Sequence, residues 1–196
     1  MTALDKASDE QALLTALRKR DAAALTTLFE AYSNPLYRLA VGLLHDDQAA
    51  EDVVQSAFVT LIQHIGHFDG RASIRTWLYR VAYNDCLQRL RGPVVVEDVD
   101  AWDEAEFMPP TLIDWGALPE AIVSGAEAQA QMLHAIGRLT PALRAVFTLR
   151  DIEGLSVRET AESLGLSEAA VKVNLHRARL SLREQLTGYF DERVRG

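Results

Sequence analysis

The stretch LSVRETAESLGLSEAAVKVNLHRARLSLREQL, residues 155–186, predicts two helices with a tight turn between them. Ser156 and Glu159 have the spacing of a capping box, which marks the start of a helix. Gly165 can take the positive φ of a sharp turn, and Ser167 can cap the helix that follows it. Two helices joined in this way form a helix-turn-helix.

The second of these helices has an apolar side and a basic side. Winding it at 100° per residue brings its apolar residues together; they are Val171, Leu175, Ala178, Leu182 and Leu186. The remaining surface carries Lys172, Val173, His176, Arg177, Arg179 and Arg183. A helix of this kind fits the major groove of duplex DNA, where Arg and Lys reach base edges and phosphates. The alternative is a charged face that only meets solvent.

The acidity of the chain is concentrated between its two halves. The formal net charge is -8, yet residues 97–127 carry nine of the 28 acidic residues and no Lys or Arg. The slightly longer segment 93–127 holds four of the six prolines and has no helical periodicity. We interpret residues 94–126 as an acidic, proline-containing linker, and each flank is then free to present a basic face.

The flank before the linker, residues 1–93, has helical periodicity throughout and no strand pattern. Asp9 and Asp21 are placed to cap its first two helices, the second of which should end near Tyr32. Ser73 is placed to cap the last helix of this flank. The predicted fold class is all-α, with two small helical domains joined by the linker.

The first half also contains the segment AAEDVVQSAFVTLIQHIGHFDGRASIRTWLYRVAYNDCLQRLR, residues 49–91. This segment resembles the core-binding and promoter-melting part of bacterial sigma factors of the sigma-70-type family. The best match is the extracytoplasmic-function (ECF) group. Residues 155–186 resemble the promoter-binding helix-turn-helix of that group. The resemblance covers most of residues 22–92 and 128–187, and the two motifs in this order across a short linker are highly specific.

The resemblance implies three parts with separate tasks. Residues 1–93 would be a region 2-like domain that binds core RNA polymerase and recognises and melts the −10 promoter element. Residues 94–126 would be the linker. Residues 127–196 would be a region 4-like domain that recognises the −35 element. The resemblance also implies an anti-sigma factor as a further partner, because ECF-like sigma factors are commonly held inactive by one.

The resemblance also assigns residues to each surface. The −35 contacts map onto Lys172, Val173, His176 and Arg177, with Arg179 on a phosphate or in a structural role. The −10 contacts map onto Phe68, Arg71, Arg75, Trp77, Arg80, Tyr83 and Asn84, and Tyr79 adds a further ring. The polymerase contacts map onto Glu51, Asp52, Gln55 and Phe58. For Phe58 and Trp77, burial in the core is an open alternative, because both lie on the apolar period.

Two other classes of function deserve comparison. A stand-alone helix-turn-helix regulator would need a ligand or phosphoacceptor domain, and residues 1–93 show no alternating strand–helix pattern. A metal-assisted hydrolase could use His64 and His67, but this spacing without a partner motif is a weak signal. We therefore expect a protein that is not an enzyme and holds no metal or cofactor. Its lone Cys86 and the lack of a long apolar run indicate the cytoplasm, with no membrane contact of its own.

Overall fold

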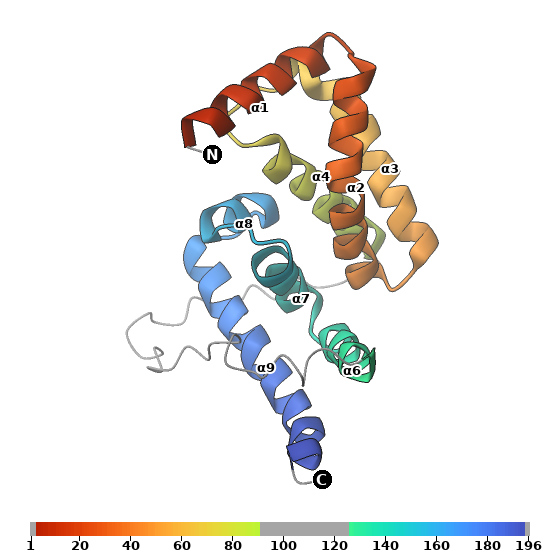
Figure 1. Cartoon of the computed structure of the whole chain (residues 1–196), viewed down its shortest axis with the longest axis vertical. Coiled ribbons are helices and arrows are strands. Elements are labelled where there is room, and N and C mark those ends of the chain that lie inside the picture. The colour runs from red at the N-terminus through yellow and green to blue at the C-terminus, as the bar shows by residue number, and fades with distance from the viewer. Residues whose placement is uncertain (1–2, 91–125, 195–196) are drawn as a thin grey trace.

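The computed structural model describes residues 3–90 and 126–194, and these residues form helices and no strand (Figure 1). The prediction of an all-α chain is thereby confirmed. The predicted linker lies outside the described residues, except for its last residue, Ala126. None of the described helices is both long enough and apolar enough to cross a membrane.

The first half is built from four α-helices and one short 3₁₀ turn. Two of the helices start at predicted caps: Asp21 accepts a hydrogen bond from the Ala23 amide at 2.8 Å, and Ser73 accepts one from the Thr76 amide at 3.1 Å. The elements are α1 (Ala3–Arg18), α2 (Ala22–Leu44), α3 (Asp47–His64), η1 (Ile65–His67) and α4 (Ile74–Leu90).

Two predicted helix ends are wrong. The first helix starts at Ala3, ahead of Asp9, in a run that is rich in good helix formers. The second helix does not end near Tyr32 but continues through Pro35 to Leu44. Proline removes one backbone hydrogen bond from a helix, but the apolar stripe continues on both sides of it, and burial of that stripe outweighs the loss. Its buried leucines are Leu28, Leu36, Leu39 and Leu43.

The second half contains the helix-turn-helix and the helices that support it. Its elements are α6 (Ala126–Gly137), α7 (Pro141–Phe147), the π-helical turn η3 (Thr148–Ile152), α8 (Val157–Leu164) and α9 (Glu168–Val194). The predicted apolar side of α9 is buried, from Val171 to Leu186, and α9 packs on α7. The periodicity of the sequence therefore gave the correct inner face of this helix.

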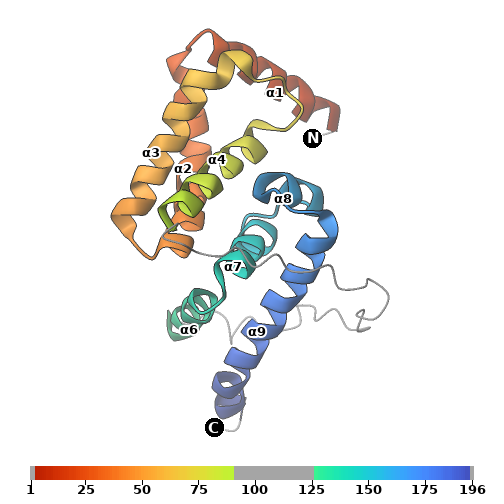
Figure 2. The ribbon, with the colours of Figure 1, turned by 180° about the vertical axis from the view of Figure 1, so that it is seen from behind.

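The two halves pack directly against each other. Helix α4 lies against α8, and α2 lies against α7, as the two opposite views agree (Figures 1 and 2). Buried side chains of both halves belong to one continuous hydrophobic cluster. The sequence indicated two modules but contained no sign that they would touch.

A buried arginine also joins the two halves. Arg144 of α7 is 4% exposed and donates hydrogen bonds to the carbonyl oxygens of Ile136 at 3.0 Å, Leu139 at 2.6 Å and Gly137. It also donates to the carbonyl of Gly42, near the end of α2. Burial lowers the pKa of this guanidinium, and carbonyl oxygens rather than carboxylates compensate its charge.

Candidate nucleic-acid interface

The helix-turn-helix has the local geometry that the sequence predicts. The Glu159 amide donates to Ser156 Oγ at 3.1 Å, and the Ser156 amide donates back to Glu159 Oε2 at 2.7 Å, which completes the capping box. Burial alone would raise the pKa of the Glu159 carboxyl, but the hydrogen bonds from Ser156 prevail and lower it. Gly165 has a φ of +69°, and Ser167 accepts from the Ala170 amide at 3.1 Å.

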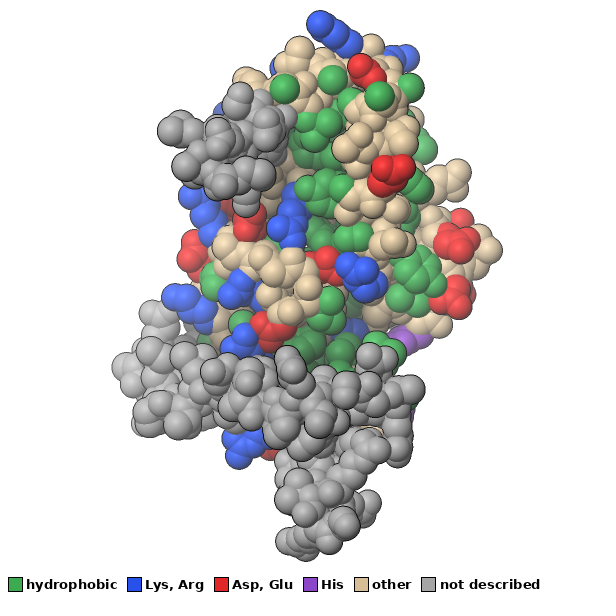
Figure 3. Space-filling model, in the orientation of Figure 1, with side chains coloured by type: hydrophobic (Ala, Val, Ile, Leu, Met, Phe, Trp, Pro, Cys, Tyr) green, Lys and Arg blue, Asp and Glu red, His purple; other side chains and the backbone are tan. Residues whose placement is uncertain are grey.

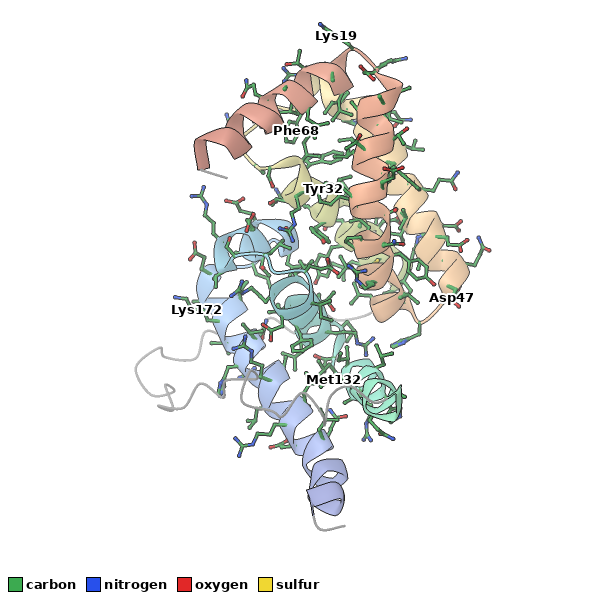
Figure 4. The ribbon with its side chains drawn as sticks, viewed as in Figure 1. Lys19, Tyr32, Asp47, Phe68, Met132 and Lys172 are labelled. Carbon is green, nitrogen blue, oxygen red and sulfur yellow. The ribbon has the colours of Figure 1, made fainter. Side chains whose placement is uncertain are left out.

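The outer side of α9 presents the residues assigned to the −35 element. Lys172 is exposed and points away from the rest of the molecule (Figure 4), and Val173, His176 and Arg177 are half-buried beside it. Lys and Arg side chains, interspersed with Asp and Glu, gather on the side of the molecule where α8 and α9 lie (Figure 3).

Arg179 differs from the other cations of α9. Its guanidinium makes a two-pronged contact with Asp151 of η3, at 2.8 and 2.7 Å. The hydrogen bond to Asp151 raises the pKa of Arg179 and outweighs the opposite effect of burial. Of its two expected roles, the structure supports the structural one: Arg179 fixes α9 to the turn that precedes the helix-turn-helix.

The residues assigned to the −10 element divide into an exposed set and a buried set. Arg71, Arg80 and Asn84 are exposed, and Arg75 and Trp77 are half-buried. Phe68 and Tyr83 are buried, and Tyr79 is only 1% exposed. The resemblance assigns these three rings to the −10 contact, and in this structure all three pack into the core. Trp77 meets Phe68 edge to face at 6.4 Å, so it is partly core and partly surface.

An open cleft of about 600 Å³ lies between part of α4 and the helix-turn-helix, although α4 and α8 also pack on each other directly. Arg71, Trp77 and Arg80 line one wall of the cleft, and Arg158, Glu162 and Glu168 line the other. Three of the residues assigned to the −10 element therefore lie across this cleft from the second half.

Sequence reasoning missed Glu153, a residue of the second half that bonds to α2 and α4 of the first. Its carboxylate is 6% exposed and accepts hydrogen bonds from Arg38 of α2 at 2.8 Å and from the Tyr79 hydroxyl at 3.2 Å. Its backbone carbonyl accepts a further hydrogen bond from Arg75. No local signal could have identified this residue, because its partners lie more than 70 positions earlier in the chain.

The residues assigned to polymerase binding lie along α3. Glu51 and Gln55 are exposed, and Asp52 is half-buried with its carboxylate 3.6 Å from Arg89. Phe58 is buried and packs against Phe29 with ring centroids 5.0 Å apart, so the core interpretation of this residue is correct.

Two apolar residues on the same helix were missed. Val59 and Ile62 are exposed and extend the outer surface that Glu51 and Gln55 begin. The signal was present in the sequence, since both residues fall outside the buried period of α3.

The histidines considered for metal binding lie near the end of the same helix. His64 Nδ1 lies 3.0 Å from the carbonyl oxygen of Thr60. Within residues 3–90 and 126–194, no three His, Cys, Asp or Glu side chains are grouped so that they could hold a metal ion.

Similarity to known proteins assigns the family. Residues 28–92 match the family described as Sigma-70 region 2, and residues 129–182 match the one described as Sigma-70, region 4. The ECF RNA polymerase sigma factor SigW of Bacillus subtilis is 32% identical over 173 residues, which cover 87% of this chain and 92% of SigW. The chain is an ECF sigma factor of the sigma-70 family. The RNA polymerase sigma-H factor of Pseudomonas aeruginosa is 31% identical over 90% of this chain and 93% of its own length.

Two solved structures share the fold of this sigma factor. CnrH, solved in complex with the cytosolic domain of CnrY, has a TM-score of 0.65 and 24% identity, with 91% of this chain and 97% of CnrH covered. RpoE from Bartonella quintana, solved in complex with the anti-sigma factor NepR, has a TM-score of 0.55 and 20% identity, with 93% and 97% covered. The match to region 2 in addition to region 4 argues against a stand-alone helix-turn-helix regulator. The protein acts as an alternative RNA polymerase sigma factor in transcription initiation.

Proposed function

We propose that the tasks of this sigma factor are divided as the sequence indicates. Residues 1–93 bind core RNA polymerase and recognise and melt the −10 element, residues 94–126 link the domains, and residues 127–196 recognise the −35 element. The observation that carries this proposal is the exposed basic side of α9 on a helix-turn-helix, in a chain that also matches region 2. The chain supplies binding surfaces and catalyses no reaction of its own. It acts in the cytoplasm, where core polymerase acts.

In the −35 contact, α9 enters the major groove. Lys172, His176 and Arg177 reach phosphates and base edges, and Val173 can touch a thymine methyl group but cannot form a hydrogen bond. Arg179 acts as a positioning residue through Asp151, since its guanidinium is engaged there.

In the −10 contact, α4 and the loop before it replace the stacking and pairing that melting removes. Arg71, Arg75 and Arg80 meet the phosphates, and Trp77 offers the ring on which a base can stack. Asn84, one turn after Arg80 on the same exposed side, can hydrogen-bond a base edge. Phe68 and Tyr83 support this surface from below rather than by touching DNA, because both are buried.

The outer side of α3 docks on core polymerase. Glu51, Asp52 and Gln55 supply its polar contacts, and the exposed side chains of Val59 and Ile62 supply apolar area that association would bury. Phe58 contributes by packing under this surface. An anti-sigma factor is a further partner, in keeping with the complex of RpoE with the anti-sigma factor NepR.

The test is run-off transcription on a genomic DNA library with purified bacterial core polymerase. We expect defined start sites that appear only when this protein is added, and the upstream sequences of these sites should share two elements. Transcripts that do not depend on the added protein, or failure to bind core polymerase, would reject the proposal.

Replacement of Lys172 by alanine should weaken promoter binding and make it less dependent on salt. One lost phosphate contact should lower the slope of log affinity against log salt concentration by about one. The measurement is binding of the polymerase–sigma complex to a mapped promoter duplex over a range of salt concentrations. Lys19→Ala is the matched control, because Lys19 is exposed at the other end of the molecule, away from α9 (Figure 4). Equal slopes for both variants would show that Lys172 does not contact the promoter.

A further inference from the structure

Helix α1 precedes residues 28–92, the part of the chain that matches region 2, and carries none of the residues assigned to DNA or polymerase. It nevertheless packs on α2 and on the 3₁₀ turn η1. Its Leu14 and Leu17 are buried in the hydrophobic core. Phe68, which follows η1, lies beneath α1 in the view of Figure 4. Helix α1 is therefore placed beside the segment that leads into the proposed −10 surface.

A long-range hydrogen bond connects the end of α1 to this segment. Arg18, the last residue of α1, donates from Nη2 to the backbone carbonyl oxygen of Phe68 at 2.7 Å, across 50 positions of the chain. The bond is partly buried, and its charged donor makes it stronger than a hydrogen bond between neutral groups. It holds the backbone where the chain leaves η1 and becomes extended, with a φ of −66° and a ψ of 116° at Phe68.

Residues 68–73 form the loop between η1 and α4. At its tip the Asp69 carboxylate accepts a hydrogen bond from the Arg71 amide at 3.1 Å and pairs with the Arg71 guanidinium at 3.0 Å. At its far end the Ser73 side chain caps α4. These contacts join residues within three positions of one another, whereas the bond from Arg18 ties the backbone of the loop to a separate helix.

The order of this loop matters for the proposed −10 contact, because Arg71 lies at its tip and Trp77 lies one turn into the helix that follows. A loop that binds DNA loses conformational freedom, and this loss weakens binding unless the folded protein has already fixed the loop. Proteins that take a base out of the stack hold it in a closely fitting pocket, so displacement of one wall weakens its capture. An anchor at Phe68 would fix the loop in advance.

We propose that Arg18 is a positioning residue for the −10 contact, which fixes the loop of residues 68–73 before the melted strand arrives. It acts through the backbone of Phe68 and does not touch DNA. The inference rests on the proposed function, because it needs this loop and α4 to be the −10 surface. Its consequence is that loss of the anchor slows the step in which the melted strand is captured and leaves the earlier binding of duplex DNA unchanged.

Trypsin cleavage of the full chain, without polymerase or DNA, tests the anchor itself. Arg71 is exposed at the tip of the loop, and cleavage after it requires the loop to open locally. We expect Arg18→Gln to speed this cleavage about tenfold, the factor for losing one charge-assisted hydrogen bond. Lys19→Gln is the matched control, because it removes the neighbouring exposed cation, and its cleavage rate should equal that of the natural chain. Cleavage after Arg80, inside α4, should be unchanged in both variants.

Promoter opening tests the consequence of the anchor. The template is a promoter mapped by run-off transcription, with 2-aminopurine in its −10 element, whose fluorescence rises when the bases unstack. The dependence of the opening rate on the concentration of the polymerase–sigma complex separates the affinity of initial binding from the rate of opening. We expect Arg18→Gln to open the promoter about tenfold more slowly with unchanged initial affinity, and Lys19→Gln to match the natural chain in both quantities.

Four results would overturn the inference. Unchanged cleavage after Arg71 in Arg18→Gln would show that the bond does not hold the loop, and faster cleavage after Arg80 as well would show that Arg18 only stabilises the domain. Equal losses of opening in Arg18→Gln and Lys19→Gln would indicate a general effect of charge. Faster loop cleavage with an unchanged opening rate would show that the anchor does not serve the promoter.

Failure of the proposed function gives a different result. If the natural chain with core polymerase opened no promoter, the assignment of the −10 surface would be rejected. The cleavage rates are measured without DNA or polymerase, so they report on the anchor at Phe68 in either case.

Discussion

Replacing Leu182 with alanine should lower the free energy of unfolding by about 2–5 kcal/mol, the range for deleting a buried leucine side chain. Leu182 is 0% exposed, and its helix, α9, packs on α7. Alanine would leave a cavity there that the rigid helices on either side could fill only in part. Urea unfolding followed by far-UV circular dichroism would measure the loss, as a shift of the midpoint.

The matched control for this change lies two residues earlier on the same helix. Leu180 is 40% exposed, so Leu180→Ala removes the same atoms from a position where much of the side chain already meets water. We expect Leu180→Ala to lower the free energy of unfolding by less than about 1 kcal/mol. Similar losses for the two variants would mean that α9 does not bury the side that the structure assigns to the core.

Replacing Arg144 with methionine should lower the free energy of unfolding by about 3 kcal/mol, because one buried and three partly buried carbonyl groups would lose their donor at once. These carbonyls belong to residues at the end of α6 and just after it, and to Gly42 of α2, so the change weakens both the second domain and its contact with the first. Methionine keeps much of the volume, which separates the loss of hydrogen bonds from the creation of a cavity. The measurement is again the urea midpoint.

Two further variants define what Arg144 contributes. Arg138→Met is the control, because Arg138 is exposed in the same part of the chain and should change stability by less than about 0.5 kcal/mol. The free energy of unfolding of Arg144→Lys should lie between those of Arg144→Met and Arg138→Met. An ammonium group keeps the charge but cannot match the forked donors of a guanidinium. Stability of Arg144→Met equal to that of Arg138→Met would show that the carbonyls find other donors.

Prediction from the sequence succeeded best in the helix-turn-helix. The capping box, the turn glycine and the period of α9 each depend on residues within a few positions of one another, so the sequence determines them locally. The same reasoning placed the exposed Lys172 on the outer side of α9 and the buried Val171 on the inner side. It failed at Tyr32, because the continuing apolar stripe of α2 overrides the local break at Pro35.

The exposure of individual rings could not be derived in this way. Phe68, Trp77 and Tyr83 are similar in the sequence, since each is an aromatic residue in or beside α4. Only the packing of neighbouring helices makes Trp77 half-buried and the other two core residues. Aromatic residues suit both a core and a stacking surface, so residue type alone leaves the choice open.

The sequence by itself determined the helices, the fold class, the acidic segment between the halves and the basic side of α9. The tertiary structure alone decided that the halves touch and that Glu153 and Arg144 join them. The physical reason is the range of the interactions involved. Helix periods and caps act within a few residues, whereas Glu153 meets Tyr79 across 74 positions and Arg144 meets Gly42 across 102. No local pattern encodes such pairs, because each depends on how whole helices pack.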